Sequence, residues 1–127
     1  MKFVICLSLL SPLLCVSAQA RDIEVGTVLT CDTQRQAERV GTLLHGDAQN
    51  VASAVSEVNA EEHSRTACGI VNAAAYVRGT DLATVRAKGE TFQIAPILLI
   101  GIVEGTDMQS VPQKVSFAVF KIDERMA

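Results

Sequence analysis

The chain of 127 residues is poor in aromatic residues and has no dense run of positive charge. It contains no tryptophan, one tyrosine and four phenylalanines, and 14 acidic residues outnumber 11 lysines and arginines. Proteins that bind nucleic acid use clustered lysine and arginine to displace counterions, often with aromatic side chains that stack on bases. We therefore expect no nucleic-acid partner.

Familiar catalytic signatures are also missing. The sequence has no G-x-S-x-G elbow, no glycine-rich phosphate loop and no H-E-x-x-H zinc motif. Its two histidines offer no recognisable set of three or four zinc ligands. The sequence thus indicates no catalytic set, no cofactor and no metal site, and an enzyme of a familiar type is not expected.

Among the features that are present, the N-terminal segment is the most informative. Lys2 precedes an almost unbroken apolar run over residues 3–16, and Ala18 and Ala20 give the small-x-small pattern that signal peptidase recognises. These 14 residues are fewer than the roughly 20 that span a bilayer as a helix. We predict a signal peptide over 1–20 that is cleaved after Ala20.

Cleavage would leave a periplasmic or secreted protein with no membrane association. Cys15 lies inside the leader, so lipid attachment and a retained N-terminal anchor are the alternatives. The bulky Leu14 before this cysteine argues against lipidation, which requires small residues there. The chain has no Asn-x-Ser/Thr sequon, which fits a bacterial periplasm.

Two cysteines, Cys31 and Cys68, remain beyond the leader. In an oxidising compartment an even pair predicts a disulfide. Such a bond would close a loop of about 38 residues and contribute roughly 4 kcal/mol in the chain-entropy model. The alternatives are two buried free thiols, or a nucleophilic Cys68 that uses His63 as its base.

Two helices are predicted in the first half of the mature chain. Thr33 and Gln36 form an S/T-x-x-E/Q capping box, and apolar residues then recur at three- and four-residue steps until Gly46. Asp47 can cap a second helix, whose apolar stripe runs over residues 51–58.

Strands are predicted on both sides of these helices, over 25–31, 69–77, 91–103 and 115–122. Pro96 removes a hydrogen-bond donor from the third strand, where we expect a bulge or a bend. Residues 81–87 could form one or two helical turns, and a loop is expected to open at 105–107 and to close near Pro112.

This order of elements predicts a single small α+β domain over residues 21–127. We expect a four-stranded, mainly antiparallel sheet (β-α-α-β-β-β) with one or two helices on one face, because the later connections are too short for parallel crossovers. A small, strongly bent, barrel-like sheet is the alternative. A disulfide between Cys31 and Cys68 would join the end of the first strand to the start of the second.

The densest group of chemically versatile residues lies in one polar segment that contains Glu61, Glu62, His63 and Arg65. An imidazole beside two carboxylates could bind a cation or act as a base, so a small hydrolase or a metal-dependent protein is one interpretation. Adjacent residues rarely converge on one point, which favours a solvated surface loop. We take these four residues as a candidate binding loop.

Residues 26–33, 58–63, 67–68 and 77–79 resemble segments of a group of short exported bacterial proteins. The resemblance implies export and the paired cysteines, and it supplies no catalytic residue. Predicted export, small size, a predicted disulfide and the lack of a catalytic set together lead us to expect a non-enzymatic domain that binds an envelope protein or a cell-wall component. Its surface would be the helix-free face of the sheet or the loop over 61–67.

Overall fold

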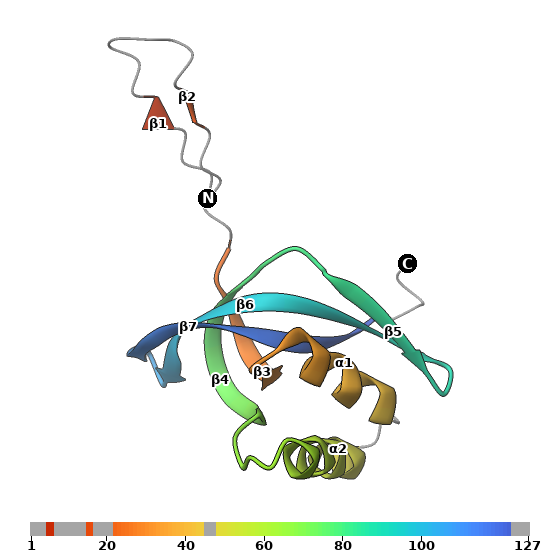
Figure 1. The fold of residues 1–127 in the computed structure, drawn as a ribbon. Coiled ribbons are helices and arrows are strands. Elements are labelled where there is room, and N and C mark those ends of the chain that lie inside the picture. Colours follow the sequence, from red (N-terminus) through yellow and green to blue (C-terminus); the bar gives the residue numbers. More distant parts are fainter. Residues whose placement is uncertain (1–4, 7–14, 17–21, 45–47, 123–127) are drawn as a thin grey trace.

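The structure is a computed structural model, and it describes residues 5–6, 15–16, 22–44 and 48–122 (Figure 1). Two helices, α1 (Gln34–Leu43) and α2 (Ala48–Glu61), lie on one face of an antiparallel sheet. The strands of that sheet are β3 (Glu24–Cys31), β4 (Cys68–Arg78), β5 (Ala83–Ala87), β6 (Glu90–Glu104) and β7 (Asp107–Ile122). For these residues the predicted α+β class is confirmed.

Two further strands, β1 (Ile5–Cys6) and β2 (Cys15–Val16), fall inside the predicted signal peptide. They pair antiparallel with each other, and Figure 1 shows them away from the sheet. The rest of 1–20 lies outside the described residues, so the leader and its cleavage stay predictions. Within the described ranges, no helix combines the length and the apolar character needed to cross a bilayer.

Four of the strands form a ring-like, strongly bent arrangement. Neighbours follow the order β4, β3, β7, β6, β5, and β4 also pairs with β6. Along one edge of β6, residues 90–94 pair with β5 and residues 97–102 pair with β4, while the other edge pairs with β7. Within the described residues the sheet thus has one strand more than predicted, and its curvature fits the barrel-like alternative.

A bulge in β4 accompanies this closure. Asn72 and Ala73 together stand opposite Thr27 of β3, and Ala73 adopts a left-handed φ of 53°. Bulges bend a strand and increase its twist. Directly after the bulge, Ala74 pairs with Gly26 of β3 on one side and begins the pairing with β6 on the other.

Pro96 lies at a position where the ladder needs no hydrogen-bond donor. The carbonyl of Pro96 accepts a hydrogen bond from Gly79 N–H at 2.7 Å. Because the nitrogen and the carbonyl of a strand residue face the same edge, the ring nitrogen of Pro96 faces the edge of β6 that pairs with β4 and β5, and it lies between those two pairings. The pairing with β7 continues in register past Pro96, so the predicted bulge is not there. The irregularity comes after Leu99, where β7 carries extra residues that include Pro112.

Two predictions about the second half of the chain are wrong. Residues 81–87 do not form helical turns, because β5 occupies most of them and alternates around the buried Val85. The expected loop over 105–112 is a tight hairpin in which Glu104 pairs with Asp107, so β7 begins well before residue 115. Gly105 supplies the positive φ of 62° in that turn. In both places, the residues form a strand because they pair with β6.

Hydrophobic residues form a cluster on each face of the bent sheet. The cluster under the helices combines side chains of both helices with strand residues such as Leu29, Phe92 and Ile94. The other cluster draws Val28, Tyr76 and further residues from the four ring strands, β3, β4, β6 and β7. Alternation along each strand sends neighbouring residues to opposite clusters, as the pleat requires.

The two helices begin and pack largely as their sequence pattern predicts. The capping box is present, with Thr33 N–H donating to Gln36 Oε1 at 3.0 Å and Gln36 N–H to Thr33 Oγ1 at 3.2 Å. α1 ends at Leu43, and the predicted end near Gly46 and the predicted cap Asp47 lie outside the described residues. Ala54 and Val58 are buried on the apolar stripe of α2, as expected.

Candidate functional site

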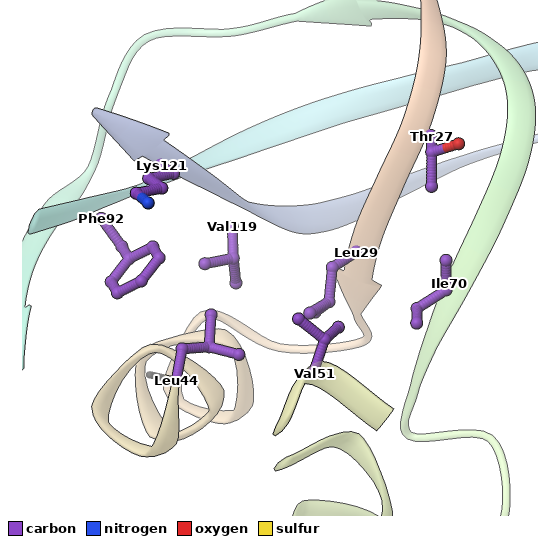
Figure 2. A pocket seen from close by; sticks show the side chains of 8 residues that line it. All are labelled: Thr27, Leu29, Leu44, Val51, Ile70, Phe92, Val119 and Lys121. Carbon is purple, nitrogen blue, oxygen red and sulfur yellow. The ribbon is translucent and has the colours of Figure 1, made fainter. Parts of the chain in front are cut away.

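A cavity of about 450 Å³ lies between the helix-facing side of the sheet and the two helices (Figure 2). We call this cavity the pocket. Most of its walls are aliphatic or aromatic. Its lining residues are Thr27, Leu29, Leu44, Val51, Ile70, Phe92, Val119 and Lys121.

The registers of the strands explain why these side chains share a wall. Leu29 of β3 stands opposite Ile70 of β4 on one side and opposite Val119 of β7 on the other. Lys121 is two residues beyond Val119, on the same face of β7, and stands opposite Phe92 of β6. Side chains directly opposite each other lie within contact distance. Five of the lining residues therefore form one continuous surface.

The helices supply the opposite wall. Leu44, the C-cap residue directly after α1, and Val51 of α2 point toward the sheet in Figure 2. α1 approaches the sheet closely, since a Cβ on Gly41 would lie 3.3 Å from the side chain of Val85. A glycine at this position lets the helix pack directly on β5.

Exposure separates the floor of the pocket from its rim. Leu29, Leu44 and Phe92 are buried, whereas Ile70 is 45% exposed and the side chain of Lys121 is 57% exposed. Solvent therefore reaches the cavity past Ile70 and Lys121. Apolar side chains on a concave surface that opens to solvent are typical of small-molecule sites.

The polar groups of the pocket are few. Thr27 Oγ1 donates a hydrogen bond to Asn72 Oδ1 at 3.2 Å. Lys121 is the one charged side chain among the described residues that line the cavity, and its Nζ lies 3.2 Å from Glu90 Oε1. The other oxygen, Glu90 Oε2, is buried, and no hydrogen-bond partner reaches it within the described part of the chain.

The predicted disulfide is present and lies beside the pocket. Cys31 and Cys68 are direct partners across β3 and β4, with their Cα atoms 4.0 Å apart, and both are buried. The pair formed by Leu29 and Ile70 lies two residues further along the same two strands. The disulfide therefore fixes the register of the two strands that carry one wall of the pocket.

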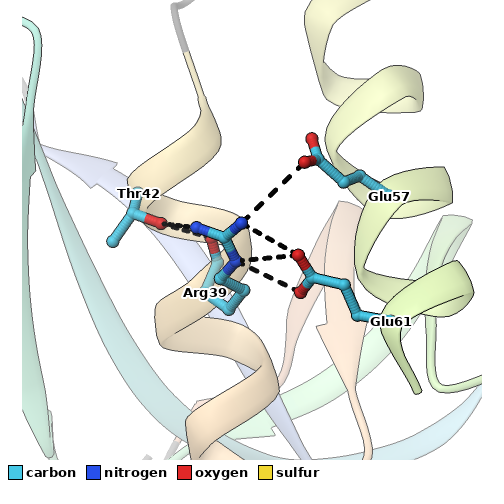
Figure 3. A network of polar contacts seen from close by, with 4 residues as sticks. All are labelled: Arg39, Thr42, Glu57 and Glu61. Carbon is cyan, nitrogen blue, oxygen red and sulfur yellow. Dashed lines mark hydrogen bonds and ion pairs between the residues drawn. The ribbon is translucent and has the colours of Figure 1, made fainter.

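The candidate binding loop begins at the end of α2, where both glutamates pair with arginines of α1. Glu61 accepts from Arg39 Nε at 3.1 Å and from Nη2 at 2.9 Å, as Figure 3 shows. The same guanidinium lies 3.8 Å from Glu57. Its hydrogen bonds and charge lower the pKa of Glu61. Glu62 lies 3.7 Å from Arg35.

His63 ends α2. Its N–H donates to Ala60 O at 3.2 Å, and Ser64 N–H donates to Asn59 O at 2.9 Å, which together make a Schellman motif. His63 occupies the left-handed position of that motif with a φ of 52°, and it is exposed. The carbonyl of Arg65 accepts from Asn59 Nδ2 at 3.1 Å, while the Arg65 side chain is exposed.

Asn59 is the residue in this region that the sequence interpretation missed. Its Oδ1 accepts from Cys68 N–H at 2.7 Å, and its Nδ2 donates to Cys68 O at 3.1 Å. The amide thus replaces a strand partner at the start of β4 and ties the end of α2 to the disulfide. A signal was available, because an amide side chain next to the buried Val58 requires partners.

None of the pocket residues was singled out as a site from the sequence. Apolar residues at strand spacing are the ordinary signal of a core, and Lys121 has the pattern of a surface lysine. The structure brings four strands and both helices together around them, and no local motif encodes that convergence.

Within residues 22–44 and 48–122, no group of three or more histidine, cysteine, aspartate and glutamate residues could hold a metal ion. The hydrolase or metal-dependent interpretation of Glu61, Glu62 and His63 stays a prediction. The resemblance to short exported bacterial proteins is likewise a prediction. Comparison of the chain with protein-family models, with curated proteins and with solved structures found no match.

Proposed function

We propose that this protein is a small exported, non-enzymatic binding domain whose site is the pocket between the sheet and the helices. The observation that carries the proposal is the 450 Å³ cavity with a largely apolar lining that opens to solvent beside Ile70. Its size falls within the roughly 300–1,000 Å³ that small-molecule sites occupy.

The driving force for binding would be burial of apolar surface. Transfer of apolar surface from water contributes about 25 cal/mol per Å², and Leu29, Val51 and Phe92 offer such surface on three sides of the cavity. An apolar ligand would bury its own surface and that of the lining at once. This favours a compact apolar group as the part of the ligand that enters.

Three features hold the pocket in shape before any ligand arrives. The disulfide fixes β3 against β4, the Thr33 capping box fixes the start of α1, and Asn59 fixes the end of α2 to Cys68. A preorganised site loses little conformational entropy on binding. The fold is therefore suited to hold a ligand without rearrangement.

Export is supported by the predicted leader and is compatible with the disulfide, which persists in oxidising compartments. The expected partner was an envelope protein or a cell-wall component. The pocket favours an envelope component small enough to enter it, or the apolar part of a larger one.

The proposal is tested by filling the cavity from α2. Val51→Phe adds a ring inside the pocket, whereas Ala52→Phe places the same ring on the exposed side of the same helix. A neutral naphthylamine fluorophore that brightens in apolar surroundings is titrated into the protein expressed from its full sequence. We expect wild type and Ala52→Phe to bind it, and Val51→Phe to bind at least about tenfold more weakly.

Far-UV circular dichroism confirms that each variant is folded, and Val51→Ala serves as a second pocket variant that enlarges the cavity. If wild type leaves the fluorophore dark, or if Val51→Phe and Ala52→Phe bind it equally, the pocket is not a ligand site.

A further inference from the structure

The placement of the one charged group in the pocket indicates which ligands fit. Lys121 lies at the exposed rim, while the floor is made of Leu29, Leu44 and Phe92. A ligand that matches this arrangement is apolar along its length and carries its charge at one end. Such a molecule is a single-chain amphiphile.

We infer that the pocket binds a single acyl or alkyl chain with an anionic head group, and that the head group pairs with Lys121. This inference rests on the proposed function and specifies its ligand. The cavity of about 450 Å³ limits the tail. A methylene group needs about as much space as a water molecule in the liquid, roughly 30 Å³, so the cavity has room for one chain of at most about fifteen carbons.

An extended peptide suits the pocket less well. Every residue of a peptide brings a backbone N–H and C=O, each of which needs a partner when buried. The hydroxyl of Thr27 already donates to Asn72, and the floor residues carry no polar side-chain atoms. A hydrocarbon tail makes no such demand, because its polar atoms are confined to the head.

The ammonium of Lys121 can donate hydrogen bonds to a second anionic partner. Its contact with Glu90 Oε1 at 3.2 Å uses one of three N–H donors. Glu90 is not a lining residue of the cavity, so the head group would meet Lys121 from the pocket side. Glu90 nevertheless lowers the positive potential there, and its removal should therefore strengthen binding of an anion.

Two substitutions of opposite sign test the head-group assignment. Lys121→Met keeps the length of the side chain and removes the charge, and Glu90→Gln keeps the shape and removes the opposing charge. Lys114→Met is the matched control, because Lys114 lies on the same strand, pairs with Asp32 at 2.9 Å and does not line the pocket. Each protein is titrated with dodecanoate, dodecyl phosphate and dodecyltrimethylammonium below their micelle concentrations, and with dodecanol below its solubility limit.

For wild type we expect one or both of the two anions to bind about fivefold or more tightly than dodecanol. Lys121→Met should remove that preference, so that neither anion binds more tightly than dodecanol. Glu90→Gln should strengthen binding of the anion about twofold or more, and Lys114→Met should behave as wild type. A preference for dodecanoate assigns a carboxylate, and a preference for dodecyl phosphate assigns a phosphate head group.

The remaining outcomes overturn the inference. Equal binding of dodecanol and both anions in every variant would show a pocket that selects for the tail alone, and the proposed function would stand without its head-group assignment. A preference for dodecyltrimethylammonium would make Glu90 the anchor. Failure of all four compounds in a protein that still binds the neutral fluorophore would overturn the inference and leave the proposed function in place.

Discussion

The segment over 61–65 and the pocket differ in whether their residues already have partners within the fold. In the segment, Glu61 is held by Arg39, Glu62 lies near Arg35, and the backbone of His63 ends α2. In the pocket, Ile70 and Val51 are apolar yet remain partly exposed beside a cavity. Residue types that suggest chemistry can thus serve structure, while residues of an ordinary core pattern can form a surface that a ligand would cover.

The disulfide connects the two regions, and its removal should have the largest effect. We expect the double variant Cys31→Ala/Cys68→Ala to lose about 4 kcal/mol of unfolding free energy, since the cross-link closes a loop of about 38 residues in the unfolded chain. Urea unfolding followed by circular dichroism measures the difference. Wild type in a reducing agent should approach the stability of the variant. A loss below about 1 kcal/mol would show that the strands keep their register without the bond.

Asn59 should have the next largest effect, because its loss leaves two backbone groups of Cys68 without partners. We expect Asn59→Ala to lower the unfolding free energy by about 2–3 kcal/mol, since the groups are partly buried. Ser56→Ala is the comparison at an exposed position of the same helix. A change below about 0.5 kcal/mol in Asn59→Ala would mean that water replaces the amide at no cost.

His63 should show an effect of the other sign. An L-residue in the left-handed region costs about 1–2 kcal/mol, and glycine adopts it without that cost. We therefore expect His63→Gly to raise the unfolding free energy by about 1 kcal/mol, while His63→Ala stays near wild type. If His63→Gly is destabilised, the imidazole makes a contact that contributes more than the strain it imposes.

The parts of this fold that were predicted from sequence have local causes. Thr33 and Gln36 satisfy each other within one helical turn, and Cys31 and Cys68 needed only an even pair and an oxidising compartment. β5 was missed because its residues 83–87 form a strand only through pairing with β6. The pocket was missed for the same kind of reason: Leu29, Phe92 and Val119 are far apart in sequence and meet only when the bent sheet packs on both helices.

The smallest expected effect concerns the ion pair between Glu61 and Arg39. Hydrogen bonds and charge from Arg39 lower the pKa of Glu61 in the folded protein, so the unfolded chain binds a proton more readily. The stabilisation is therefore present above the ordinary glutamate pKa of about 4.3 and is lost as the pH falls through the lowered value. The two side chains are 42% and 44% exposed, which keeps the effect small and sensitive to salt.

We expect wild type to be slightly more stable than Glu61→Gln at pH 7 and low salt, and this difference to shrink toward zero below pH 4. Glu104→Gln, at an exposed position in the β6–β7 hairpin, is the control that removes a carboxylate elsewhere on the surface. Thermal unfolding of the three proteins from pH 7 to pH 3 measures the difference, and repetition at high salt should reduce it. A difference that persists at pH 3 would mean that Glu61 stabilises the end of α2 through packing of its side chain. The contrast between the charged segment and the apolar pocket would then be weaker than the ion pairs suggest.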